Sequence, residues 1–369
     1  MRKSGWGLMA AGGLLGSALL AATVVCLGSG CSTLGYYAQA VNGHLGLLQS
    51  AQPVSEWTAD AATPEPLRQR LALSQRMRDF ATAELQLPAN DSYRHYADLH
   101  RSAAVWNVVA TPELDLTLKT WCFPVLGCVG YRGYYSREPA DALAADLRAQ
   151  GLETLVYGVP AYSTLGWSNW VGGDPLLNTF INWPEGELAR LIFHELAHQV
   201  AYAADDTTFN ESFATAVERI GSRRWLQQHG APQALADNAL AEQRRADFRA
   251  FALRWRGALD ALYNGPGTDL AKREGKASLM AQMRADYQVM KAARWGGFAG
   301  YDDWVERANN AAFAVQAAYN ELVPDFEALF ERSGSDFGRF YTEVRRLAAL
   351  PKAERRAQLA HSPHPTARN

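Results

Sequence analysis

The sequence lacks the features that mark several large classes of protein. Cysteine is scarce, with 4 residues in 369, and the charges nearly cancel, because 36 Lys and Arg residues face 38 Asp and Glu residues for a net charge of −2. No basic stripe alternates with aromatic residues, so nucleic-acid binding is not indicated. No internal repeat with a fixed period is present. What remains is a chain long enough for a large core, organised as one large domain or two closely packed lobes.

Residues 1–30 have the composition of an export signal. A positive start at Arg2 and Lys3 precedes an apolar, uncharged run from Leu8 to Leu27. That run is long enough to raise the alternative of a membrane-spanning helix, although its glycines argue against one. The next residues, Leu-Gly-Ser-Gly-Cys ending at Cys31, resemble a bacterial lipoprotein processing site, although Gly28 stands where a leucine is usual. We therefore predict lipidation of Cys31, ahead of a retained anchor or an ordinary secreted protein.

The other cysteines agree with a periplasmic location. Ser32, not aspartate, follows Cys31, which favours anchoring in the outer membrane of a Gram-negative cell. Cys26 is lost with the signal, so Cys122 and Cys128 remain. In an oxidising compartment these two are predicted to form a short-loop disulfide, the alternative being two reduced, buried thiols. No further cysteine pair is available for a second zinc site.

The most informative motif is H-E-x-x-H, formed by His194, Glu195 and His198 within an apolar run that predicts a helix over Glu185–Tyr202. Residues four apart on a helix lie on one side, one turn apart, so both imidazoles can bind one zinc ion. Glu195 can reach a water molecule beside the ion without being a ligand itself. The alternative is a buried helix whose two histidines bond to backbone carbonyl groups.

A catalytic zinc ion usually takes a third protein ligand and keeps one position for water. Asp205 and Asp206 lie in a predicted turn and are expected to be turn and cap residues. Glu211 and Glu218 lie seven residues apart on a predicted helix over Asn210–Gln227. We predict Glu211 as the ligand and keep Glu218 in reserve. A capping box would instead use Glu211 at its own helix N-terminus, and Glu218 could instead orient a histidine.

These motifs carry a resemblance to known enzymes. The run H-E-L-A-H followed by N-E-S-F-A resembles the gluzincin metallopeptidases, whose second helix places the glutamate of N-E-x-x-A on zinc. From about Cys31 to Leu350 the chain is similar to a bacterial family of predicted aminopeptidases, many of them predicted lipoproteins. Three further segments carry this similarity: Trp121–Tyr134, Val159–Trp167 and Asn309–Pro324. One departure is the connection between His198 and Glu211, only twelve residues long, although a short connection can still bring two antiparallel helices together.

The resemblance implies a zinc peptide hydrolase. The ion is expected on His194, His198 and Glu211, with Glu195 as general base. Gluzincins often add a Tyr or His from a later helix to stabilise the charged carbonyl oxygen, and Tyr319 is the first candidate here. The second candidate is Tyr301, and the carboxylates considered for a substrate's free ammonium group are Glu218 and Asp174.

Two rival functions remain open at this point. A metalloendopeptidase would use the same centre. A non-catalytic envelope lipoprotein would keep the fold as a binding module, but a purely structural zinc site needs no general base, so Glu195 argues against it. The expected partners are a peptide substrate and a membrane, through the lipid on Cys31.

The expected fold is α+β, predominantly helical and zincin-like, with a small twisted sheet beside the H-E-x-x-H helix. Residues 31–350 are expected to form a single domain, followed by a loose tail over 351–369. The segment Ala161–Trp167 is either a strand that binds substrate or a turn under the site. Helical and strand patterns predict these elements: strands at Ala104–Ala110, Leu114–Lys119 and Leu155–Val159, and helices at Pro139–Gln150, Leu270–Lys291, Trp304–Leu322, Pro324–Arg332 and Asp336–Leu350.

Overall fold

The computed structural model describes residues 35–37, 39–123, 127–161, 173–204, 206–317 and 322–360. The chain divides into two units, residues 1–49 and 50–369. In the first unit, residues 39–49 are helical. The expected signal segment and Cys31 lie outside the described residues. Within the described part of the chain, no helix is both long and apolar enough to cross a membrane.

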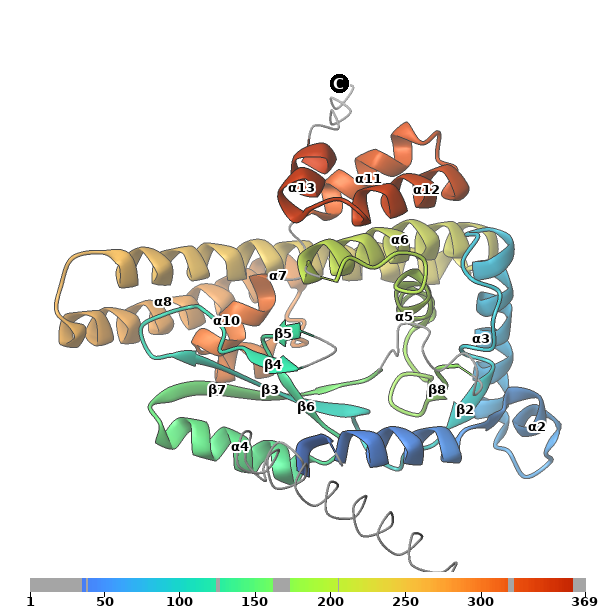
Figure 1. Cartoon of the computed structure of the whole chain (residues 1–369), viewed down its shortest axis with the longest axis horizontal. Helices are drawn as coiled ribbons and strands as arrows, with labels where there is room; N and C mark the ends of the chain where they lie inside the picture. The colour runs from blue at the N-terminus through green and yellow to red at the C-terminus, as the bar shows by residue number, and fades with distance from the viewer. Residues whose placement is uncertain are drawn as a thin grey trace, which may run out of the picture. The chain divides into compact units, whose positions relative to one another are not determined.

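The second unit combines many helices with small sheets (Figure 1), so the fold is α+β and predominantly helical, as predicted. Its most extended sheet has β3 (Val105–Pro112) in the middle, with β6 (Arg132–Tyr134) on one side and β7 (Leu152–Val159) on the other. Both neighbours run antiparallel to β3. Helices α4 (Arg137–Ala149) and α10 (Asn310–Ala317) cover opposite faces of this sheet.

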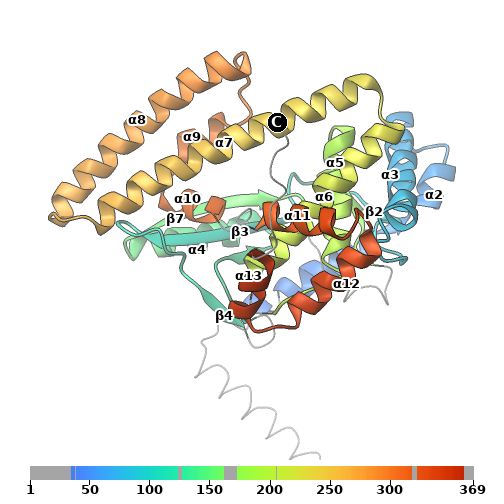
Figure 2. The same ribbon diagram turned by 90° about the horizontal axis from the view of Figure 1, so that it is seen from above.

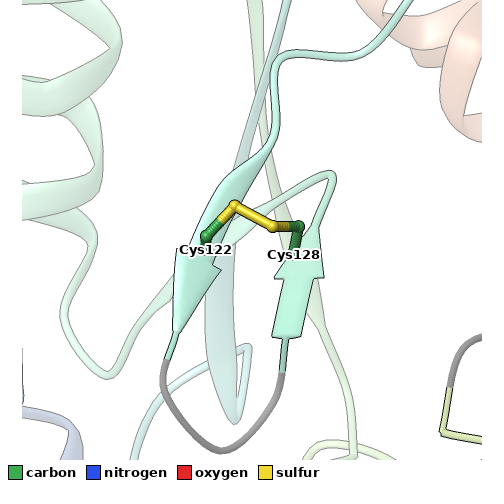
Figure 3. Close-up of a disulfide and its surroundings, with 2 residues drawn as sticks. All are labelled: Cys122 and Cys128. Atoms are coloured by element: carbon green, nitrogen blue, oxygen red, sulfur yellow. A yellow bond between two sulfur atoms is a disulfide. The ribbon is translucent and has the colours of Figure 1, made fainter.

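Two smaller strand groups accompany this sheet. One joins β1 (Gln52–Pro53), β2 (His95–Ala97) and β8 (Leu176–Leu177), with β2 in the middle, antiparallel to β1 and parallel to β8. The other is a hairpin of β4 (Trp121–Phe123) and β5 (Gly127–Val129). Cys122 and Cys128 face each other in this hairpin and form the expected disulfide (Figure 3).

The strand expected over Leu114–Lys119 is wrong, because that segment contains no strand. The chain turns here instead, with Lys119 N donating to Ala110 O at 2.8 Å. The amide of Asn310 donates to the carbonyl oxygens of Pro112, Glu113 and Asp115, at 3.1, 2.8 and 3.1 Å. Turn formation therefore prevails over the strand pattern here.

Helices α2 (Val54–Ala59) and α3 (Glu65–Ala83) begin directly after prolines, which suit a helix start. Further along, α5 (Glu185–Ala197) and α6 (Thr207–His229) pack closely on each other. Gly221 allows this approach, because a Cβ atom there would lie only 2.9 Å from Cδ2 of Phe193. The expected metal ligands lie in this pair of helices, except His198, which directly follows α5.

The helices α7 (Pro232–Asn264) and α8 (Asp269–Trp295) form a long hairpin, seen from two directions in Figures 1 and 2. Helix α8 ends at Gly296, whose left-handed φ of +58° suits glycine. The single helix expected over Trp304–Leu322 is wrong, since the described part is split into α9 (Asp302–Arg307) and α10. The split is caused by Asn309, whose side chain caps α10 by accepting from Ala312 N at 3.1 Å and donates to Thr154 O at 2.9 Å.

The C-terminal helices α11 (Val323–Arg332), α12 (Phe337–Ala348) and α13 (Lys352–Ala360) follow, and α11 packs on α6. The expected loose tail is wrong as far as Ala360, because α13 is an ordered helix. Its residues Arg355 and Leu359 are 3 % and 0 % exposed, so packing fixes the helix despite its polar sequence. Residues 361–369 lie outside the described part.

Candidate metal centre

The two histidines of H-E-x-x-H lie at the C-terminal end of α5. His194 is in its last turn, and His198 is the residue directly after the helix, with φ −57° and ψ −23°. The Nε2 atoms of the two rings are 3.1 Å apart. The helix ends at Ala197, five residues before the expected end at Tyr202. Its early end turns the chain toward α6 directly after the second histidine.

The side chain of Asn210 determines that turn. Its Oδ1 accepts from Ala203 N, and its Nδ2 donates to Ala203 O, both at 2.8 Å. The N-cap of α6 is Asp206, whose side chain accepts from Phe209 N at 3.1 Å. Asp206 is therefore the cap residue that the sequence led us to expect, and Asn210 orients the connection between the two helices.

Glu211 lies in the second turn of α6 and points at both histidines. Its Oε2 is 3.4 Å from Nε2 of His194 and 3.7 Å from Nε2 of His198. The capping-box alternative for Glu211 is wrong, because the helix starts earlier than that pattern requires. His194, His198 and Glu211 offer three ligand atoms that lie within 4.8 Å of one another, so the group could hold a metal ion.

The spacing of these three atoms fits a small tetrahedral ion. Bonds of about 2.0–2.1 Å at tetrahedral angles place two ligand atoms about 3.3 Å apart, close to the separations of 3.1, 3.4 and 3.7 Å seen here. Burial, and then the neighbouring His194, lower the pKa of His198 to about 4. Burial lowers the pKa of His194, but Glu211 and Glu218 outweigh it and raise the value well above its usual range, so metal binding has to displace the proton that His194 holds.

Glu218 does not point at the metal position, although it was the reserve ligand. Its Oε2 lies 2.9 Å from Nδ1 of His194, the ring nitrogen that faces away from Glu211. Its other oxygen forms a buried ion pair with Arg190 of α5, which is also 3.5 Å from Glu242 of α7. Burial alone would raise the pKa of Glu218, but Arg190 and His194 outweigh it and lower the value to about 2. Glu218 therefore orients a histidine, which was its alternative role.

The expected general base, Glu195, directly follows His194 in α5 and does not belong to the group of three possible ligands. Its charge reaches the phenol of Tyr93, in the loop before β2, and helps to raise the pKa of that phenol.

Tyr157 is a residue near the centre that the sequence reading missed. It lies on β7, directly across from Asn107 of β3, and its hydroxyl accepts from Asn107 Nδ2 at 3.4 Å. Burial raises the pKa of the Tyr157 phenol, and the charge of Glu211 raises it further, against the lowering effect of Asn107. The side chain is only partly buried. The sheet therefore brings one protonated hydroxyl within electrostatic range of a possible metal ligand, Glu211.

Neither of the two tyrosines proposed from the sequence is seen near the possible metal ligands in the described part of the chain. Tyr319 lies outside the described residues. Tyr301 precedes α9, and its ring stacks on Phe248 at 4.0 Å between centroids, within an aromatic cluster that also includes Trp295. Tyr301 thus has a packing role.

A family model described as "Putative aminopeptidase" matches residues 35–359. The chain belongs to this putative aminopeptidase family. The match includes all three possible metal ligands, Glu195 and helix α13. The family description supports a peptidase, that is, an enzyme that hydrolyses peptide bonds. No curated protein and no solved structure matches the chain.

Proposed function

We propose that this protein is a zinc-dependent aminopeptidase of the bacterial cell envelope. The observation that carries the proposal is the triangle of ligand atoms from His194, His198 and Glu211. Two imidazoles and one carboxylate suit zinc, and three protein ligands leave one position open, as in catalytic sites. The family description supports the peptidase part of the proposal.

A zinc ion on these side chains would act as a Lewis acid that polarises the peptide carbonyl and lowers the pKa of water. Glu195 accepts the proton of the attacking water and passes it to the leaving amine. Glu218 holds the His194 ring through Nδ1. Tyr157 keeps its own proton free for donation, because its oxygen accepts from Asn107, and it stabilises the carbonyl oxygen as charge develops there.

The choice between aminopeptidase and endopeptidase depends on the substrate's free ammonium group. Of the two carboxylates considered, Glu218 is already bonded to Arg190 and His194. Asp174, the other carboxylate, is buried and also has an interaction partner, so neither is singled out as the site for the ammonium group. The backbone oxygen of Asp174 accepts from Tyr93 N at 2.7 Å, so Asp174 lies beside the loop before β2.

The envelope location rests on the sequence before residue 32. The positive start, the apolar run and the small residues before Cys31 support export and lipidation. Mass spectrometry of the mature protein tests this, because an acylated N-terminus at Cys31 is expected.

The test of the function is a digest of a peptide library by the zinc-loaded protein, read by mass spectrometry. Every peptide is supplied with a free and with an acetylated N-terminus. An aminopeptidase shortens only the free peptides, whereas an endopeptidase cuts both. Glu195→Gln is the control, since it keeps the three ligands and should bind zinc normally without cleaving. A wild-type protein that binds zinc and cleaves nothing would contradict the proposal and favour a binding module.

A further inference from the structure

Tyr93 is a buried tyrosine whose hydroxyl has no hydrogen-bond partner among the described residues. Its side chain is 1 % exposed. Burying a hydroxyl without a partner costs free energy, and native proteins seldom do so without a reason. Tyr341 of α12 offers a comparison, because it is 2 % exposed and donates to Leu85 O at 2.9 Å. The two tyrosines are equally buried and differ in whether the hydroxyl is satisfied.

The backbone at Tyr93 adopts a conformation that residues with a side chain rarely take. Its φ is +66°, in the left-handed region. Tyr93 N donates to Asp174 O at 2.7 Å, and Gln75 Nε2 donates to Tyr93 O at 2.9 Å. Such conformations persist only where the surroundings enforce them, and they cluster at functional sites.

A buried arginine holds the rest of the loop. Arg78 of α3 is completely buried and donates to the carbonyl oxygens of Ser92, Pro88 and Asn90, at 2.9, 2.5 and 3.0 Å. The loop before β2 is therefore a rigid support for Tyr93.

This loop is bonded to the chain just after the C-terminal end of α5, the helix that carries Glu195. Gln199, two residues after the helix ends at Ala197, accepts from Asn90 Nδ2 at 2.7 Å and donates to Ser92 Oγ at 3.2 Å. Burial raises the pKa of Tyr93 well above its usual value, and the nearby charges of Glu195 and Asp174 raise it further. The phenol therefore stays protonated, and its hydroxyl is a hydrogen-bond donor within electrostatic range of the proposed general base.

We propose that Tyr93 is a positioning residue for Glu195. When substrate is bound, the Tyr93 hydroxyl donates to one carboxylate oxygen of Glu195 and keeps the other oxygen directed at the attacking water. Catalytic hydrogen bonds are often absent without substrate and tighten in the Michaelis complex, which accounts for the unsatisfied hydroxyl. The inference rests on the proposed function, because it assigns Tyr93 to the same reaction.

The experiment compares Tyr93→Phe with Tyr341→Phe in the zinc-loaded full chain. For Tyr93→Phe we expect wild-type zinc content, an unchanged or higher melting temperature, and a kcat at least about 10-fold lower with little change in KM. For Tyr341→Phe we expect the reverse, a lower melting temperature with unchanged kcat, because it loses a satisfied buried hydrogen bond. In a Glu195→Gln background, Tyr93→Phe should cause no further loss.

Binding of acetohydroxamate, measured by calorimetry, adds a readout that needs no turnover. This chelator ligates zinc and offers a proton to the general base, so Tyr93→Phe should weaken its binding and Tyr341→Phe should not. If Tyr93→Phe shows wild-type kinetics and wild-type chelator binding, the inference about Tyr93 is wrong, whereas the proposed function still stands. A fall in melting temperature like that of Tyr341→Phe would also overturn it, by showing a structural role. If the wild type neither cleaves peptides nor binds the chelator, the proposed function fails and the inference fails with it.

Discussion

Oε2 of Glu218 lies 2.9 Å from Nδ1 of His194, so the carboxylate determines which ring nitrogen faces Glu211. Arg190 holds the same carboxylate from the other side. This row of three side chains links α5 to α6 beside the metal position. It explains why a buried arginine lies only four residues before the motif.

Replacing Glu218 by Gln should weaken zinc binding by about 10- to 100-fold, because the partner of a ligating histidine sets its orientation and basicity. Competition with a chelator of known affinity measures the effect. Glu242→Gln is the matched control, since Glu242 lies 3.5 Å from the same Arg190 and forms no ion pair with either histidine among the described residues. Equal affinities for the two variants would contradict the role given to Glu218.

Tyr157→Phe should lower kcat by about 100-fold or more if its hydroxyl stabilises the charged carbonyl oxygen. Zinc affinity should stay unchanged, because the tyrosine is not one of the grouped ligands. Tyr134→Phe serves as control, because Tyr134 pairs with Trp106 and alternation places it on the opposite face of the sheet from Asn107. If both variants keep wild-type kcat on the best library peptide, Tyr157 has no part in the reaction.

Asp206→Ala should destabilise the fold by about 3–5 kcal/mol, because it leaves the buried Arg355 without its ion partner. Asp206 caps α6 and is 3.1 Å from Arg355 and 2.9 Å from Arg356 of α13. The control is Asp336→Ala, which removes a half-exposed N-cap from α12 and should cost only about 1 kcal/mol. Urea unfolding of both variants gives the comparison, and similar losses would count against the buried pair.

The contribution of Asp206 should also depend on pH. Burial alone would raise the pKa of Asp206, but Arg356 and the Phe209 amide outweigh it and leave the pKa below its usual 3.8. A carboxylate with a lowered folded-state pKa stabilises the fold above its unfolded value and loses this effect as the pH falls through 3.8 and below. The stability difference between wild type and Asp206→Asn should therefore shrink in acid. A difference that is constant from neutral pH to below the folded pKa would contradict this.

The sequence alone was enough to predict features that depend on residues close together in the chain. Helical spacing placed His194 and His198 on one side, and the structure brings Glu211 to them. The disulfide followed from the count of cysteines, and the main helices began within a few residues of the expected positions.

What the sequence reading missed depends on partners far apart in the chain. Tyr157 gains its place through Asn107, fifty residues earlier. Helix α13 looked like a polar tail because its partner, Asp206, is about 150 residues away. The capping box at Glu211 failed for a related reason. That pattern depends only on neighbouring residues, whereas Asp206 takes the cap position and also pairs with two arginines from far along the chain.

The paired bonds between Asn210 and Ala203 have a consequence for metal exchange. They tie the connection between the two ligand-bearing helices through bonds that involve none of the three possible metal ligands. The connection should thus keep its shape when the metal is removed, and chelation should leave a folded apoprotein. Cobalt could then replace zinc by simple dialysis, and its visible absorption would report directly on the three ligands.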